Sequence, residues 1–276
     1  MKMKRVAAFG IGTVMMVSMC VPAMAADGTT DKAYTLTFMA DPTLVSSGFV
    51  YEPVNFTIPA GTPETTTLGE ILEDNNVPFQ GSTSYISGLQ CAEAATFSLT
   101  DAQKANFPEA AFDTRIMVDP TSDAGKDGWL SEKEFTGYAG WMMYVDNQTS
   151  VADSSQPYGS YYYTLGSSIA DLEKYGILAD DNVVLEMFFS FDMGADIGMS
   201  DSYLPTSIVE TDTYTTYDWS GPSEVHTAIS KANRTELVKA LAANKTSPSY
   251  ADGLSVLKNL SSTQDEVDFS TVMLNE

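Results

Sequence analysis

The sequence predicts an α+β protein in which a β-rich domain, residues 33–198, is followed by a linker, residues 199–221, and a helical appendage, residues 222–276. Residues 34–40 alternate apolar and polar side chains, as a half-buried strand does. Thr67 and Glu70 have the spacing of a helical capping box. After Pro222 the apolar residues recur at helical spacing. Strands first and helices last are typical of an α+β chain.

The first 25 residues have the order of a secretory signal peptide. A basic start is followed by an apolar run over residues 6–21 and by a small-x-small exit that ends at Ala25. We therefore expect cleavage after Ala25 and a secreted or cell-surface location. A lipoprotein is the alternative, but Met19 precedes Cys20 where such sites want a small residue. No later segment is long and apolar enough to span a membrane, and Cys91 is expected to be a small buried group.

The chain is strongly acidic, with 37 Asp and Glu against 14 Lys and Arg and a formal charge of −23. Such a surface repels nucleic acid and anionic lipid, so neither is an expected partner. Solubility outside the cell accounts for most of these charges.

Strands are expected at residues 34–40, 54–58, 84–89, 141–145, 161–165 and 182–191. One short helix should begin after Thr67 and stop before Pro78, and another should begin after Ser167 or Ser168 and end at Gly176. Residues 92–136 are polar and irregular and are interpreted as an acidic insertion. Further helices are expected at residues 223–232, 235–243, 251–260 and 263–274.

The stretch GYAGWMMYVDNQ, residues 137–148, concentrates soft apolar side chains in an acidic chain. Alternation turns Trp141 inward and leaves Met142 and Tyr144 on the other face of the strand. This face has two interpretations, an ordinary sheet surface or a ligand contact. Aromatic side chains form stacking platforms for a sugar or a flat macrocycle, so the predicted ligand-binding residues are Trp141, Met142, Tyr144 and Tyr162.

Residues 123–134, DAGKDGWLSEKE, contain most of an EF-hand loop. Hard cations need converging oxygen atoms, and a glycine at the sixth position permits the sharp turn. A calcium site would use the side chains of Asp123, Asp127, Ser131 and Glu134 and the Trp129 carbonyl. The alternative is an acidic surface loop with an ordinary helix start at Ser131.

Catalytic patterns are weak in this chain. His226 is the sole histidine, and it falls in the predicted helical appendage, away from the β-rich domain. A serine or cysteine nucleophile activated by histidine is therefore not expected there, and no spacing singles out a carboxylate pair. The prediction is a non-enzyme.

Three segments resemble the transcobalamin-like C-terminal domain family of exported bacterial proteins. They are residues 85–89 (YISGL), 140–147 (GWMMYVDN) and 180–189 (DDNVVLEMFF). The resemblance implies a β-grasp-like fold over residues 33–198 and a non-catalytic binding module, with a corrinoid as the best ligand. Asp146-Asn147 replaces the family's usual Asn-Gly turn, which weakens the carry-over of any ligand contact.

The C-terminal residues 263–268, TQDEVD, resemble the last helix of the "found in various architectures" modules of surface proteins. That resemblance implies cell-wall or surface protein partners. The alternative function is therefore a surface adhesin or architectural module that binds glycan or protein and has no small-molecule ligand.

Overall fold

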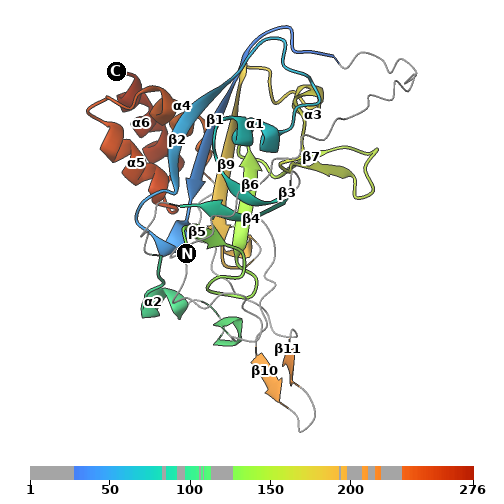
Figure 1. Ribbon diagram of the computed structural model, residues 1–276. Helices are drawn as coiled ribbons and strands as arrows, with labels where there is room; N and C mark the ends of the chain where they lie inside the picture. The colour runs from blue at the N-terminus through green and yellow to red at the C-terminus, as the bar shows by residue number, and fades with distance from the viewer. Residues whose placement is uncertain are drawn as a thin grey trace, which may run out of the picture.

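The computed structural model describes residues 28–82, 85–91, 97–105, 107, 109–112, 127–192, 194–197, 207–210, 215–218 and 232–276. Its centre is a four-stranded sheet in the order β2-β1-β9-β6 (Figure 1). The strands are β1 (Tyr34–Asp41), β2 (Tyr51–Ile58), β6 (Gly140–Val145) and β9 (Asn182–Ser190). The two central strands, β1 and β9, are parallel, and the outer strands β2 and β6 are antiparallel to their neighbours.

Both faces of this sheet are covered, which explains the composition of β9. Leu185 and Phe189 point into the main core, whereas Val184 and Phe188 point into a second core on the opposite face. All residues of β9 after Asn182 are buried. Strands buried on both faces lose the simple apolar and polar alternation and become almost continuously apolar.

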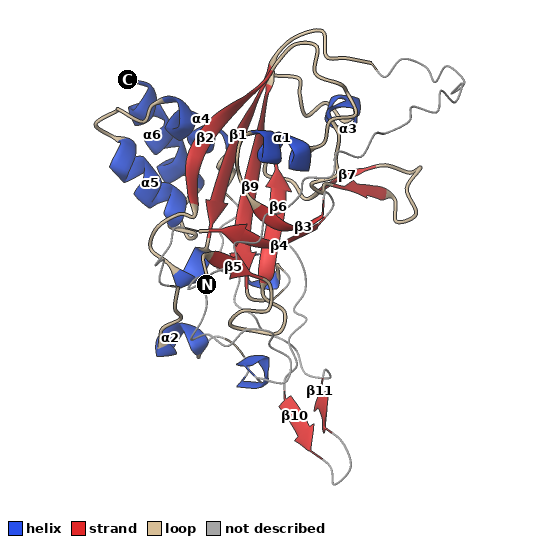
Figure 2. Ribbon diagram, viewed as in Figure 1, coloured by secondary structure: helices blue, strands red, loops and turns tan. Residues whose placement is uncertain are grey.

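Two helices and a smaller sheet cover the first face. α1 (Leu68–Asp74) and α3 (Ile169–Lys174) each begin with a complete capping box, at Thr67 and at Ser168. The smaller sheet has the order β3-β4-β5, with β3 (Phe79–Ser82), β4 (Tyr85–Gln90) and β5 (Trp129–Ser131). Figure 2 shows its strands running across those of the main sheet. A Cβ on Gly88, where β4 meets β5, would lie 2.9 Å from the Ser131 Oγ, so a larger residue there would require the Ser131 side chain to move.

Three helices cover the second face, and we call them the helical unit: α4 (Thr235–Ala243), α5 (Tyr250–Lys258) and α6 (Gln264–Asn275). Leu237 and Leu241 of α4 pack in one core with Met39, Val184 and Phe188 of the sheet. The helical unit therefore shares buried apolar surface with the β-rich part of the chain.

The remaining elements are short. They are α2 (Asp101–Lys104), the 3-10 helices η1 (Thr43–Val45), η2 (Glu109–Phe112) and η3 (Ala195–Ile197), and the strand pairs β7 (Ser150–Ala152) with β8 (Ser160–Tyr162) and β10 (Ser207–Glu210) with β11 (Thr215–Asp218). Within the described ranges, no helix has the length and apolar character needed to cross a membrane.

The predicted α+β class is confirmed, while the finer β-grasp-like description stays a prediction. The helix start at Ser131 is wrong, because Trp129–Ser131 is the strand β5 and pairs with β4. The region interpreted as an irregular insertion thus contributes a strand to the smaller sheet. The predicted linker also contains a strand pair, β10 and β11. The predicted signal peptide and His226 lie outside the described residues, as does the helix predicted at 223–232 except for Ala232.

Candidate functional site

Trp141, the first of the predicted ligand-binding residues, is part of the main core. Its side chain is 7 % exposed, and its Nε1 donates a hydrogen bond of 2.8 Å to the Leu130 carbonyl of β5. Its ring meets Phe189 edge to face, with the centroids 5.4 Å apart. These contacts use both the apolar ring and the polar nitrogen to join β6 to its neighbours.

Met142 and Tyr144 lie on the other face of β6, as alternation predicts, and they pack against the core formed with the helical unit. The Tyr144 ring meets Phe188 edge to face at 5.7 Å, and its hydroxyl donates to the Ile197 carbonyl at 3.3 Å. Burial and the nearby Glu186 carboxylate raise the pKa of Tyr144 to about 12. The soft apolar surface of this strand thus contacts another part of the same chain.

Tyr162 is different, because its side chain is 58 % exposed. It ends β8 in a segment that we call the tyrosine hairpin, residues 150–162, in which Ser150 pairs with Tyr162 and Ala152 with Ser160. Tyr158, in the connecting loop, is 87 % exposed. In Figure 1 the β7 end of this hairpin projects away from the main sheet. Two aromatic side chains are therefore presented to solvent by one short segment.

The base of the tyrosine hairpin is fixed by contacts between aromatic rings. Tyr161 lies between Tyr175, at a centroid distance of 4.7 Å, and Tyr163, at 5.9 Å. Its hydroxyl also donates to the Ser167 Oγ at 3.0 Å. The inward tyrosine of the β8 strand thus anchors the hairpin to α3 and leaves its neighbour Tyr162 outside.

The tip of the hairpin is ordered by Asp153. Its Oδ1 accepts bonds from the Ser155 amide at 2.8 Å and the Ser155 hydroxyl at 2.6 Å. Its Oδ2 accepts from the Tyr175 hydroxyl at 2.6 Å and from the Lys174 Nζ at 3.2 Å. These bonds, with those from Ser155 first, hold the pKa of Asp153 well below its usual range. The loop closes when the Asp153 amide donates to the Gly159 carbonyl at 2.9 Å.

Gly159 permits this turn, since its φ of 71° is a left-handed conformation that favours glycine. Tyr158 therefore stands next to a backbone that is fixed by its own hydrogen bonds. The exposure of Tyr158 could have been predicted from the sequence. A tyrosine between Pro157 and Gly159 is typical of the tip of a turn and not of a core strand.

The predicted calcium loop is described only from residue 127 onward, so Asp123 lies outside the described residues. Asp127 uses its Oδ1 to accept the Trp129 amide at 2.9 Å, and Ser131 lies in β5. Glu134 is completely buried between Lys133 and Phe135, which both have positive φ. Among the described residues, no group of three or more His, Cys, Asp or Glu side chains is placed to hold a metal ion. Calcium binding stays a prediction.

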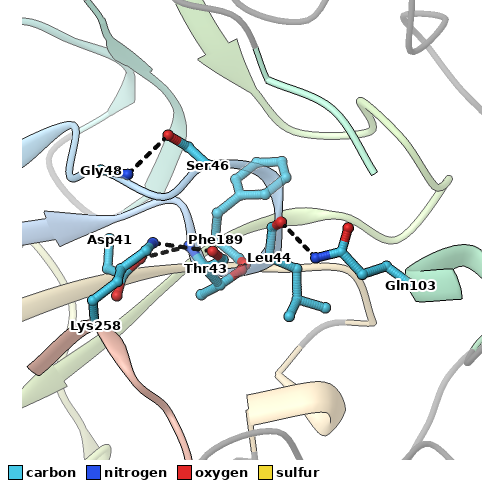
Figure 3. Close-up of polar contacts among 8 residues, drawn as sticks. All are labelled: Asp41, Thr43, Leu44, Ser46, Gly48, Gln103, Phe189 and Lys258. Carbon is cyan, nitrogen blue, oxygen red and sulfur yellow. Dashed lines mark hydrogen bonds and ion pairs between the residues drawn. The ribbon is translucent and has the colours of Figure 1, made fainter. Parts of the chain in front are cut away.

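A polar junction joins the sheet to the helical unit (Figure 3). The Asp41 carboxylate at the end of β1 is completely buried, accepts the Thr43 amide at 2.7 Å and pairs with Lys258 at the end of α5. The Lys258 Nζ also donates to the Thr43 carbonyl at 3.0 Å and lies 5.5 Å from the Phe49 ring centre. Burial raises the pKa of Asp41, and the ammonium of Lys258 opposes that shift.

Hydrogen bonds fix the loop that follows Asp41 and contacts Lys258. Thr43 has a φ of 52°, and its hydroxyl donates to the Phe189 carbonyl at 2.5 Å. Gln103 donates from Nε2 to the Leu44 carbonyl at 2.9 Å. Shallow depressions of about 470 Å³ and about 480 Å³ flank Lys258 on its two sides. Because Lys258 is already paired with a buried carboxylate, this junction is suited to fixing the helical unit rather than to binding an anion.

Comparison with known proteins gives no match for this chain among family models, curated proteins or solved structures. The resemblances to the transcobalamin-like family and to the surface-protein helical module therefore stay predictions.

Proposed function

We propose that the chain is an exported, non-catalytic binding module whose contact with its ligand is the tyrosine hairpin. The observation that carries the proposal is the pair of exposed rings, Tyr158 and Tyr162, on a loop ordered by its own hydrogen bonds. Tyrosine offers a large contact area and loses little conformational entropy on binding. A loop that is fixed before binding also avoids part of the entropic cost of association.

The ligand class that suits this surface best is a neutral glycan. The two rings supply flat contact area, while Ser154, Ser155 and Gln156 add hydroxyl and amide groups for hydrogen bonds. The net charge of −23 disfavours anionic ligands. This reading corresponds to an adhesin or architectural module at the cell surface.

A corrinoid is the second candidate, and it is supported by the resemblance to the transcobalamin-like family. Of the four residues that the sequence points to, Tyr162 presents its side chain to solvent, whereas Trp141, Met142 and Tyr144 are engaged with other parts of the chain. A corrinoid that used the Met142 face would require the helical unit to move away. This requirement makes the glycan the better supported ligand.

The experiment is a screen of the labelled mature protein on an array of neutral glycans, alongside calorimetric titration of cyanocobalamin with calcium present. Three proteins are compared: the parent, the double variant Tyr158→Ser with Tyr162→Ser, and a control, Phe269→Ser with Val272→Ser, which loses two exposed apolar side chains elsewhere. We expect glycan binding that the hairpin variant loses and the control keeps.

Glycan binding that survives in the hairpin variant, or no glycan binding by the parent, would overturn the proposal. Stoichiometric saturation with cyanocobalamin would instead establish the second candidate. Binding of cyanocobalamin should then be tested in Tyr162→Ser and in Tyr144→Phe.

A further inference from the structure

The outer side of α6 carries two large apolar side chains that are exposed and do not pack against the rest of the helical unit. Phe269 is 68 % exposed and Val272 is 56 % exposed. Residues three apart lie on the same side of a helix, so these two form one ridge. The buried residues Val267 and Leu274 lie on the opposite side, against α4 and α5.

Helix stability does not explain this ridge. Phenylalanine and valine form helices less readily than alanine, leucine, lysine or glutamate. At an exposed position they also gain little from burial within the chain. Adjacent exposed apolar side chains are a feature of surfaces that contact another molecule.

The surroundings of the ridge are acidic. Asp265, Asp268 and Glu276 are exposed at helical spacing around it, and α6 contains no lysine or arginine. The whole chain has a net charge of −23. A second copy of the chain would bring like charges together, whereas a cationic partner would be attracted.

A groove of about 400 Å³ runs beside the ridge, between the start of α4 and α6. It is lined by Asn233, Glu236, Gln264, Val267, Asp268 and Thr271. The Asn233 amide donates to the Gln264 Oε1 at 2.8 Å, and the Gln264 Nε2 donates back to the Asn233 carbonyl at 3.2 Å. These bonds join the start of α4 to α6. Two carboxylates lie on the groove: Glu236, which is exposed and pairs with Lys239 at 3.0 Å, and Asp268, which accepts the Gln264 Nε2 at 2.7 Å.

We propose that the ridge of Phe269 and Val272, with the adjoining groove, is a docking surface for a cationic amphipathic helix of a partner protein. Apolar side chains of the partner pack on the ridge, as in other contacts made by amphipathic helices. Its lysine or arginine side chains lie along the groove near Glu236 and Asp268. Charge complementarity fixes the orientation, and the apolar contact supplies the affinity.

This surface is separate from the tyrosine hairpin. Figure 1 shows the helical unit and the β7 hairpin on opposite sides of the main sheet. The inference therefore goes beyond the proposed function, because the chain would hold a protein partner on one side and a ligand on the other.

The test uses the full mature protein and a fluorescent model peptide of leucine and lysine at helical spacing, with anisotropy measured at physiological ionic strength. We expect Phe269→Ser with Val272→Ser to lower the affinity about tenfold, the loss typical of removing an apolar contact centre. Glu236→Gln with Asp268→Asn should also weaken binding. The matched control is Tyr158→Ser with Tyr162→Ser, which should bind as the parent does.

A peptide of the same composition without helical spacing should bind more weakly than the helical peptide. Equal affinity of the parent and the Phe269→Ser, Val272→Ser variant would overturn the proposal, since binding would then reflect the acidic surface alone. Self-association of the parent that this variant abolishes, seen by sedimentation, would also overturn it. Because both side chains are exposed, circular dichroism should show an unchanged helix content in the variant.

Discussion

The ammonium group of Lys258 at the end of α5 is paired with the Asp41 carboxylate at the end of β1, 217 residues away in the sequence. The carboxylate is completely buried, and the Lys258 side chain is largely buried. A contact of this kind costs desolvation of both charges, so its net contribution to stability is small. Its geometry, however, fixes where the helical unit sits on the sheet.

Removal of the Lys258 side chain should lower the free energy of unfolding by far more than the ion pair contributes to it. Lys258→Ala leaves a buried carboxylate without its countercharge, and such changes cost about 3–5 kcal/mol. The measurement is the free energy of unfolding from urea denaturation. Lys239→Ala is the control, because Lys239 pairs with the exposed Glu236, and an exposed pair is worth at most about 1 kcal/mol. Similar losses in the two variants would contradict the structural role given to Lys258.

The stability of the protein should depend on pH through Glu186. This side chain is 2 % exposed, and burial raises the pKa of its carboxyl to about 7, although Arg234 opposes the shift. A folded-state pKa above the unfolded value means that the folded protein binds the proton more tightly. Stability from this group is therefore present at low pH and is lost as the pH rises through about 7.

The size of this effect follows from the shift between the ordinary value of 4.5 and about 7. Each pKa unit corresponds to about 1.4 kcal/mol, so the contribution is about 3 kcal/mol. Glu186→Gln should remove this pH dependence and should be the more stable protein at pH values above the Glu186 pKa. Because the other acidic residues are the same in both proteins, their contributions to the pH dependence cancel when the two stability profiles are compared. Parallel stability profiles would show that Glu186 does not titrate in this range.

The order of the tyrosine hairpin should depend on the Tyr175 hydroxyl, which donates to the Asp153 Oδ2. Tyr175→Phe keeps the ring that contacts the Tyr161 ring and removes this donor. We expect faster hydrogen exchange at the Gly159 amide, which closes the loop by donating to the Gln156 carbonyl. The unfolding midpoint should stay unchanged, because the affected contacts are local. Unchanged exchange at Gly159 would mean that Asp153 orders the loop through Ser155 and Lys174 without the Tyr175 hydroxyl.

Local patterns were sufficient to predict several elements of the fold. The capping box at Thr67 was visible in the sequence because it uses residues three positions apart. The apolar and polar alternation that predicted β1 was equally local. The helix start at Ser131 was wrongly predicted from an equally local pattern, because Ser131 and Glu134 have capping-box spacing. Lys133 and Phe135 adopt positive φ, which is incompatible with a helix there.

The candidate site was less predictable, because exposure depends on contacts between distant segments. Alternation correctly placed Met142 and Tyr144 on the face opposite Trp141. Alternation gave no information on what covers that face. The helical unit, which begins almost a hundred residues later in the chain, covers it. Tyr162, one of the predicted ligand-binding residues, is 58 % exposed and lies in β8, which pairs only with the short strand β7 among the described strands.

Close approach of the three helices should make Gly253 of α5 sensitive to side-chain size. A Cβ at this position would lie 3.0 Å from both the Leu241 Cδ2 of α4 and the Leu274 Cδ1 of α6. Gly253→Ala adds strain at these two flexible side-chain ends but gains about 1 kcal/mol of helix propensity, so its net effect should be small. Gly253→Val adds two further methyl groups at the same place, and overpacking of this kind costs about 1–3 kcal/mol. Urea denaturation of both variants checks the pair, and equal stability of Gly253→Val and the parent would show that the helices are not in contact at this position.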